Sequence, residues 1–233
     1  MTVHVILMGP QGSGKGTQSQ LLRERLDLAS VATGELFRAA IKAGTPLGQQ
    51  IKAIYDRGEL IPDDLTVALV EERLDQIADE QARTGSPAGA LYDGFPRTEA
   101  QADALDAALA RRGEGIAAVI AIDVPRDVLI ARLAGRRVCS VCGRVYNVVS
   151  DPPRVPGQCD VDGGALIQRA DDTPEAVSRR LDLYEVETAP LLTRYAKRGV
   201  LERVDGDRAI DEVTDALVAA IQRRTNLPAS AGR

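Results

Sequence analysis

Apolar and polar residues follow two alternating patterns along the chain. Continuous apolar runs predict four buried strands, at residues 3–8, 90–93, 117–123 and 200–204. Apolar residues at helical spacing predict helices at 17–26, 63–77, 98–110, 126–133, 174–197 and 211–223. Residues 32–61 predict further short helices, broken at Gly44, Pro46 and Gly58, and residues 81–89 predict a polar loop.

This alternation predicts an α/β fold in which helices cover both faces of a parallel sheet. Ligands of such sheets bind beyond the carboxyl ends of the strands, where a Gly-rich loop, Asp93 and Asp123 would gather. Residues 135–172 hold Cys, Gly, Pro and Val without a helical period, which predicts a small inserted β module. Residues 226–233 are predicted to form a disordered tail.

The composition is ordinary for a globular chain of 233 residues, enough for one α/β domain with an insertion. A net charge of −5 argues against a general nucleic-acid or anionic-membrane binder, so a bound anion needs a local cluster of cations. No apolar run approaches the roughly 20 residues that span a bilayer, and the apolar start is too short for a signal peptide. We therefore expect a cytoplasmic protein with no nucleic-acid or membrane partner, and a monomer by default.

The first loop has the pattern of a phosphate-binding loop. Residues 9–17 read GPQGSGKGT, with Gly9, Gly14 and Lys15 at the expected spacing between a strand and a helix. The glycines let backbone N–H groups point at phosphate oxygens, the helix adds its positive end, and the lysine reaches the terminal phosphates. One departure is that the hydroxyl follows the lysine only after an intervening glycine. The predicted nucleotide-phosphate site comprises Gly12, Ser13, Gly14, Lys15, Gly16 and Thr17.

All three cysteines lie in the inserted module, which indicates a metal site more than a disulfide framework. Cys139 and Cys142 are separated by two residues, and Cys159 and Asp162 repeat that spacing. Three thiolates and a carboxylate would give Zn²⁺ a closed, structural tetrahedral site. Asp160 is an alternative fourth ligand, and iron or cobalt could take the place of zinc.

Five motifs occur in a fixed order: KGTQ at 15–18, ATGELFR at 32–38, YDGFPRT at 92–98, GRRVC at 135–139 and QRADD at 168–172. On these motifs the chain resembles the adenylate kinase family over about residues 1–225. The resemblance implies a P-loop NTPase-type core at 1–31, 62–134 and 173–225, a helical AMP-binding insertion at 32–61 and a metal-bearing lid at 135–172. It also implies reversible phosphoryl transfer from MgATP to AMP, giving two ADP, and a role in adenine nucleotide homeostasis.

The resemblance also implies roles for individual residues. The AMP site would comprise Thr33, Arg38, Glu59, Leu60, Ile61, Gly94, Arg97 and Gln101, together with Arg169 and Arg180, which would meet the transferring phosphoryl group. Besides the phosphate loop, the ATP site would comprise Arg132, Arg136, Val145, Tyr146 and Arg208. Asp93 would orient water on the Mg²⁺ of MgATP. The length of the loop at 81–89, and Tyr92 in place of a commoner aliphatic residue, depart from the family pattern.

These residue types suit phosphoryl transfer. The attacking oxygen of AMP is already anionic, so no general base is required, and the single histidine, His4, is predicted to be structural. The reaction needs charge neutralisation and alignment of two polyanions, which arginine provides because its planar fork binds phosphate oxygens in pairs. Closure of the lid about hinges near Gly135 and Asp172 would exclude water from the reacting groups.

Other functions fit parts of the pattern. A kinase for UMP, CMP or GMP would share most of it, although Gln101 and the long lid favour AMP. A nucleotide- or nucleic-acid-binding zinc module would use the same cysteines, but the acidic net charge and the scarcity of aromatic residues argue against it. A P-loop GTPase is disfavoured because the sequence has no Asn-Lys-x-Asp segment to read guanine.

Overall fold

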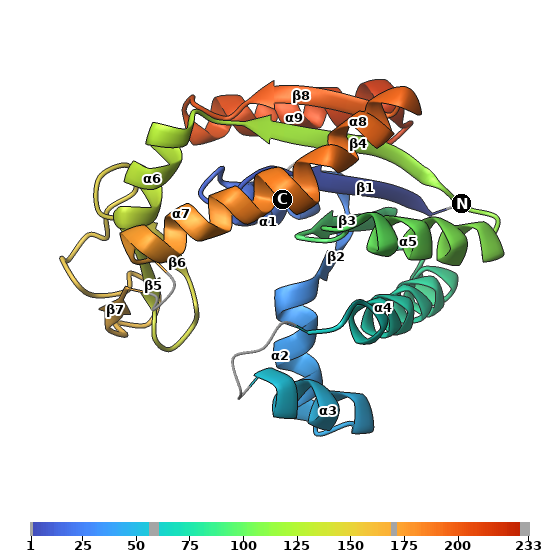
Figure 1. Ribbon diagram of the computed structural model, residues 1–233, viewed down its shortest axis with the longest axis horizontal. Coiled ribbons are helices and arrows are strands. Elements are labelled where there is room, and N and C mark those ends of the chain that lie inside the picture. Colours follow the sequence, from blue (N-terminus) through green and yellow to red (C-terminus); the bar gives the residue numbers. More distant parts are fainter. Residues whose placement is uncertain (1, 56–60, 169–171, 229–233) are drawn as a thin grey trace.

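The computed structural model describes residues 2–55, 61–168 and 172–228. Its centre is a parallel sheet of five strands in the order β2-β3-β1-β4-β8 (Figure 1). The strands are β1 (Val3–Met8), β2 (Leu28–Ala32), β3 (Gly89–Asp93), β4 (Ile116–Asp123) and β8 (Leu201–Asp205). The α/β fold with a P-loop-type parallel sheet is therefore confirmed.

Helices cover both faces of this sheet. On one face, Leu22 of α1 (Lys15–Leu26) and Leu217 of α9 (Ile210–Arg224) pack in a single buried cluster with Val5 and Ile120 of the strands. A second cluster packs against the opposite face. It draws on α4 (Asp63–Thr84), α5 (Glu99–Arg111) and α8 (Ala189–Lys197). Burial on both faces explains why the central strands are mostly apolar, with His4 as a buried exception in β1, instead of alternating with polar residues.

Two smaller units project from the same side of the sheet (Figure 1). The first is formed by α2 (Thr33–Ala43) and α3 (Pro46–Tyr55), which are separated at Gly44 in the left-handed conformation. The second follows α6 (Arg126–Ala134) and contains the antiparallel strands β5 (Arg136–Cys139), β6 (Val145–Asn147) and β7 (Leu166–Ile167). These strands lie within residues 135–172, for which we keep the name lid.

The long helix predicted at 174–197 is interrupted. It consists of α7 (Pro174–Leu183), the π-helical turn η1 (Tyr184–Thr188) and α8. Pro190 has no N–H, so the carbonyl of Val186 has no regular helical donor, and the Ala189 N–H bonds instead to the Tyr184 carbonyl five residues back. The prediction of one continuous α-helix was wrong because it did not account for this proline.

Three further predictions are corrected by the structure. Residues 81–84 form the last turn of α4 and not a loop, because the helix ends only where Gly85 adopts the left-handed conformation. Strand β2 was missed, since its sequence LASVA is short and only partly apolar. Leu227 was placed in a disordered tail, yet it is buried in the cluster with α1 and α9. Residues 229–233 lie outside the described residues.

The other predicted strands and helices are confirmed within a few residues of their expected ends. Within the described ranges, no helix combines the length and apolar character needed to cross a bilayer.

Candidate functional site

The loop between β1 and α1 has the conformation of a phosphate cradle. Gly12 and Gly14 have φ of 86° and 93°, values that side chains with a Cβ rarely adopt. A Cβ on Gly9 would approach the carbonyl oxygen of Ile122 to 2.9 Å, so a side chain there would collide with β4. The shape of this loop therefore requires glycine at positions 9, 12 and 14.

Polar groups in the loop are arranged for an anion. The Lys15 Nζ donates to the carbonyl oxygens of Gly9 at 2.6 Å and Pro10 at 2.8 Å, so the ammonium lies over the loop. The Ser13 hydroxyl is buried and has no hydrogen-bond partner in the described part of the chain. An unpartnered buried hydroxyl beside an ammonium group and the start of a helix fits phosphate oxygens as ligands.

Burial changes the acid–base properties of the loop. It lowers the pKa of Lys15 to about 8, against the opposing effect of the Asp93 carboxylate at the end of β3. Burial also raises the pKa of Asp93, and here the Lys15 ammonium opposes it. The two groups face each other across the carboxyl ends of β1 and β3, where the register pairs Leu7 with Asp93. Asp93 is thus placed beside the phosphate loop.

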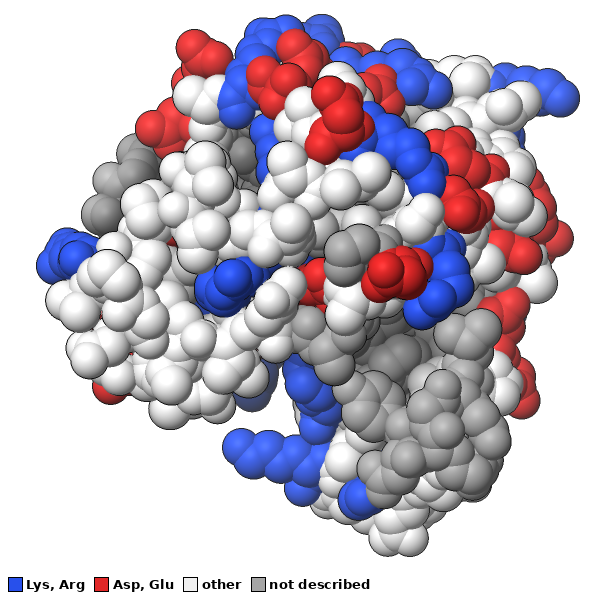
Figure 2. All heavy atoms as spheres, turned by 60° about the vertical axis from the view of Figure 1, so that its left-hand side comes forward, with Lys and Arg blue, Asp and Glu red and all other residues white. Residues whose placement is uncertain are grey.

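A cavity of about 690 Å³ opens beside this loop. Eight residues predicted to bind nucleotide line it: Lys15, Thr33, Arg38, Ile61, Gly94, Arg97, Gln101 and Arg180. They come from segments far apart in the sequence, and the sheet brings them together at the carboxyl ends of β1 and β3. Figure 2 shows a hollow in this side of the molecule with basic side chains at its edges.

The turn after β3 holds Arg97 in place at this cavity. The Arg97 Nε donates to the Gly94 carbonyl at 2.7 Å, and the Thr188 hydroxyl of η1 donates to the Arg97 carbonyl at 3.0 Å. The hydroxyl of Thr33 also donates to the Gly94 carbonyl, at 3.3 Å. Helix α2 and the turn η1 therefore both meet the turn after β3, and among the described residues the Arg97 guanidinium donates only through its Nε.

Gln101, in the first turn of α5, is held by two neighbours. Its Oε1 accepts from the Arg97 backbone N–H at 2.8 Å, and its Nε2 donates to Asp63 Oδ1 at 2.6 Å. Asp63 opens α4 and also accepts at Oδ2 from the Thr98 hydroxyl at 3.0 Å. The side chain of Gln101 is 7% exposed and lines the cavity.

A fully buried carboxylate joins two of the predicted arginines. Asp172 pairs in bidentate fashion with Arg136, whose Nε donates to Oδ2 at 2.8 Å, and its Oδ1 lies 3.6 Å from Arg180 Nη1. Arg136 begins the first strand of the lid, whereas Arg180 belongs to α7. Asp172 therefore links the first strand of the lid to the helix that follows the lid.

The residues predicted to bind ATP outside the phosphate loop lie on α6, on the lid and on the loop after β8. Arg132 of α6 donates to the Gly206 carbonyl at 3.0 Å and to Asp207 at 3.2 Å, which places it against the loop that carries Arg208. Val145 is exposed on the lid. The side chain of Tyr146 is buried, and its hydroxyl contacts Cys159 Sγ and the Asp160 N–H, so it serves the interior of the lid.

Three of the predicted site residues, Glu59, Leu60 and Arg169, lie outside the described residues.

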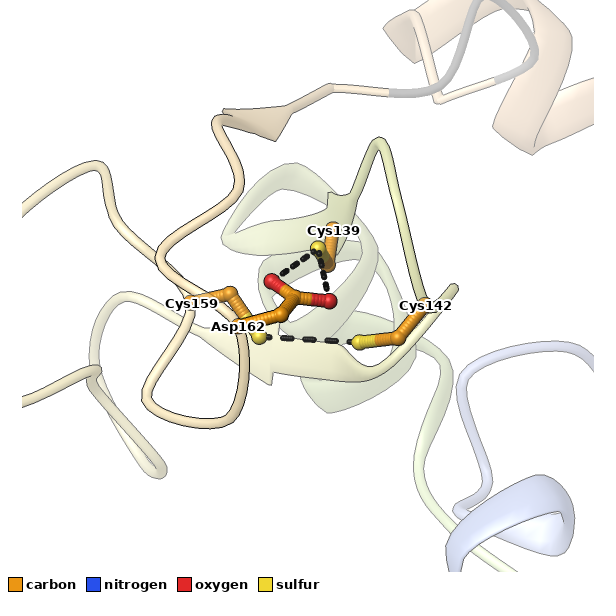
Figure 3. Close-up of side chains that lie close together, drawn as sticks. All are labelled: Cys139, Cys142, Cys159 and Asp162. Carbon is orange, nitrogen blue, oxygen red and sulfur yellow. Dashed lines mark hydrogen bonds between the residues drawn. The ribbon is translucent and has the colours of Figure 1, made fainter.

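The lid brings four potential metal ligands together (Figure 3). The Sγ atoms of Cys139, Cys142 and Cys159 and a carboxylate oxygen of Asp162 all lie within 4.8 Å of one another. Asp162 contacts Cys139 Sγ at 3.2 Å, and the sulfurs of Cys142 and Cys159 are 3.6 Å apart. Three sulfurs and one oxygen converging on one point fit a tetrahedral structural site for a metal such as zinc.

The geometry separates the two aspartates that the sequence left as alternatives. Asp162 faces the thiols and is fixed by the Gly164 N–H, which donates to its Oδ1 at 2.8 Å. The Oδ1 of Asp160 accepts instead from the Arg154 N–H at 2.9 Å. Asp162 is therefore the fourth member of the cluster.

A second cavity, of about 750 Å³, lies between α8 and the ends of β4 and β8. It is lined by Pro10 of the phosphate loop and by Asp123, which was expected at the ligand edge of the sheet, but by none of the residues assigned above to the ATP, AMP or metal sites. The smaller cavity is the candidate active site because it holds the phosphate loop and the arginines together.

Sequence reasoning assigned no site role to Asp63 or Thr188, and it considered Asp172 only as a hinge. Asp63 and Thr188 contact residues 38 and 91 positions away in the sequence, so no local pattern marks them. Asp172 lies in the QRADD motif, which was the one available signal for its contact with an arginine.

Comparison with known proteins gives consistent matches. A sequence profile of the family described as adenylate kinase matches residues 7–200. An adenylate kinase of Moorella thermoacetica is 50% identical over 221 residues, which cover 95% of this chain and 99% of that protein. The adenylate kinases of Carboxydothermus hydrogenoformans and Bacillus subtilis are each 48% identical, over 94% and 91% of this chain and 99% and 94% of their own lengths.

Proposed function

This chain belongs to the adenylate kinase family, whose members transfer phosphoryl groups between nucleotides, and from that premise we propose that it interconverts MgATP and AMP with two molecules of ADP. One observation carries the proposal. Lys15 of the phosphate loop and Arg38, Arg97, Arg180 and Gln101 all line a single cavity. A cavity with a phosphate cradle at one end and a nucleotide-sized pocket at the other suits two substrates held end to end.

The proposed chemistry relies on charge and not on a catalytic base. The loop N–H groups and Lys15 bind the ATP phosphates, while Arg38 and Arg97 bind the AMP phosphate. Arg136 and Arg180 neutralise the charge of the transferring group, with Arg169 as a further predicted contributor. Mg²⁺ bound to ATP would supply additional charge neutralisation, and Asp93 would orient water on this ion.

We further propose that the lid is held together by Zn²⁺ on Cys139, Cys142, Cys159 and Asp162. The lid buries few large side chains, so a metal would supply much of its stability. With four protein ligands the ion would have a structural role only. The substrates are then the small molecules ATP, AMP and ADP, and we propose a monomer that works in the cytoplasm.

A coupled assay of ADP formation tests the reaction. The enzyme is supplied with MgATP and, in separate reactions, AMP, UMP, CMP or GMP. AMP is expected to give a kcat/KM at least about 100-fold above the others, because a buried polar contact to the base rejects a mismatched edge. Faster turnover of another monophosphate would reassign the substrate. No turnover of any monophosphate would leave only nucleotide binding.

A further inference from the structure

The amide of Gln101 has a fixed direction in this cavity. The Asp63 carboxylate can only accept hydrogen bonds, so the amide group that faces it at 2.6 Å must be the NH₂. The Arg97 backbone N–H can only donate, so the atom that faces it at 2.8 Å must be the amide oxygen. Both neighbours favour the same orientation, and the contact with the Asp63 carboxylate is the charge-assisted and therefore stronger of the two.

This orientation leaves a defined set of free groups. A glutamine side chain offers two N–H donors and two lone pairs, and one of each is used by Asp63 and Arg97. Among the contacts of the described residues, one donor and one acceptor therefore remain for a ligand in the cavity, in a fixed spatial order. An amide that was free to rotate by 180° could offer the same pair in either order.

The order matters for purine bases. A 6-aminopurine presents a donor at its amino group and an acceptor at N1, whereas a 6-oxopurine presents an acceptor at O6 and a donor at N1. An amide held in one orientation can form both hydrogen bonds with only one of these two donor–acceptor orders. Rejecting the wrong base by leaving buried polar groups unpaired is among the strongest forms of discrimination available to a protein.

We propose that Asp63 is a positioning residue that sets the direction of the Gln101 amide and thereby makes the pocket select a 6-aminopurine over a 6-oxopurine monophosphate. This inference rests on the proposed AMP site. Asp63 does not need to touch the base. It acts by linking the first turns of α4 and α5, since its second oxygen accepts from Thr98, the N-cap residue of α5.

Asp63 differs in this respect from the adjacent Asp64. Both lie in the first turn of α4, where a negative charge is favourable near the positive end of the helix. Asp63 is partly buried at the cavity, whereas Asp64 is exposed and does not line it. The same substitution at Asp64 is thus a matched control for charge and helix effects.

The test compares AMP with IMP, which differ in the group at C6 and in the protonation of N1. The ratio of kcat/KM for AMP to that for IMP is measured with MgATP for wild type, Asp63→Ala, Asp63→Asn and Asp64→Ala. Asp63→Ala is expected to lower the ratio by about 10-fold or more, because only the neutral contact with the Arg97 N–H then holds the amide and the reversed orientation becomes accessible. Asp63→Asn should lower it less, and Asp64→Ala should leave it unchanged, with KM for ATP constant throughout.

A purely structural role for Asp63 would reduce turnover of AMP and IMP alike and leave the ratio intact, which would overturn the inference. The inference also fails if Asp64→Ala lowers the ratio as much as Asp63→Ala. If Asp63→Ala does not fold, the isosteric Asp63→Asn decides by the same criterion. Wild-type enzyme that does not prefer AMP over IMP would instead contradict the proposed function, whatever the variants do.

Discussion

Lys15 shows how much a single side chain can depend on the ligand it is built to bind. Among the described residues its ammonium donates to carbonyl oxygens of its own loop, and burial is the main reason that its pKa is lowered to about 8. Repulsion from neighbouring arginines, Arg97 and Arg180 among them, contributes to this lowered pKa, while the Asp93 carboxylate opposes it. A polyphosphate would reverse these effects, because it supplies the opposite charge that this group of cations lacks.

Nucleotide binding should therefore be coupled to proton uptake. At pH 8 about half of the free protein has a neutral Lys15, and bound ATP should restore the missing proton, giving uptake of roughly half a proton per site. At pH 6.5 Lys15 is already charged, so its uptake should vanish. Titration calorimetry in two buffers of different ionisation enthalpy measures this number. The variant Lys15→Arg, which stays charged, should show no such uptake at pH 8, and equal uptake by both proteins would refute the assignment.

His4 is the other residue with a distinct acid–base role, and it lies away from the cavity. Its Nδ1 contacts the Tyr92 hydroxyl at 2.9 Å, and its Nε2 contacts Glu114 at 3.0 Å. Burial lowers the pKa of His4, and the opposing effect of Glu114 is smaller. The structural role predicted for His4 is confirmed by these contacts, which also account for the unusual Tyr92.

The low pKa of His4 predicts a loss of stability in mild acid. Above about pH 6.5 the imidazole is neutral in both states, but below it the unfolded chain takes up a proton that the folded chain resists. The free energy of unfolding should fall between pH 7 and 5.5, with a slope of at most about 1.4 kcal/mol per pH unit. Urea titrations of wild type and His4→Gln should show a shallower slope for the variant, since it is the only histidine. Identical slopes would show that His4 titrates normally.

At the scale of elements, the lid connection depends on Asp172. Its carboxylate is fully buried between Arg136 and Arg180, which are themselves only partly exposed. Removing a buried charge leaves its partners uncompensated, a cost that solvent near the arginines reduces.

Asp172→Asn should lower the free energy of unfolding by about 2 kcal/mol. Asp182→Asn is a suitable comparison, because Asp182 lies on the same helix in an exposed pair with Arg126. That variant should cost about 0.5 kcal/mol or less, as surface ion pairs contribute little. Equal losses in the two urea titrations would contradict the role given to Asp172.

The lid itself provides the second element-scale prediction. Purified protein should contain one metal ion, measured by mass spectrometry of the metal content, and a strong chelator should lower its unfolding temperature by several °C. Asp162→Asn should weaken metal binding by at least about 10-fold, whereas Asp160→Asn should retain the ion. Metal loss in the Asp160 variant alone would exchange the two assignments. If the purified protein contains no metal ion and the chelator leaves its unfolding temperature unchanged, the three cysteines are unligated thiols and the proposed metal site is wrong.

Across the whole molecule, the contiguous motifs could be predicted from the sequence and the long-range contacts could not. GPQGSGKGT and the paired Cys spacings each carry their chemistry within a few residues, so the phosphate loop and the metal cluster were predicted directly. Arg38 and Arg97 were assigned only by resemblance to the family. Asp63 and Thr188 were not predicted as site residues, because their hydrogen-bond partners are remote in the sequence. The π-helical turn was not predicted either, because a single proline produces it within an otherwise helical pattern.

The burial of Leu227 also determines how the protein can be attached to a surface or a label. Its side chain belongs to the buried cluster that α1 and α9 form with the sheet, and its carbonyl accepts from Gln222 Nε2 at 3.2 Å. A fusion joined at residue 226 would remove the Leu227 side chain and expose the apolar cluster to solvent. Affinity tags and fluorophores for single-molecule work should therefore be attached after residue 228, so that Leu227 stays in place.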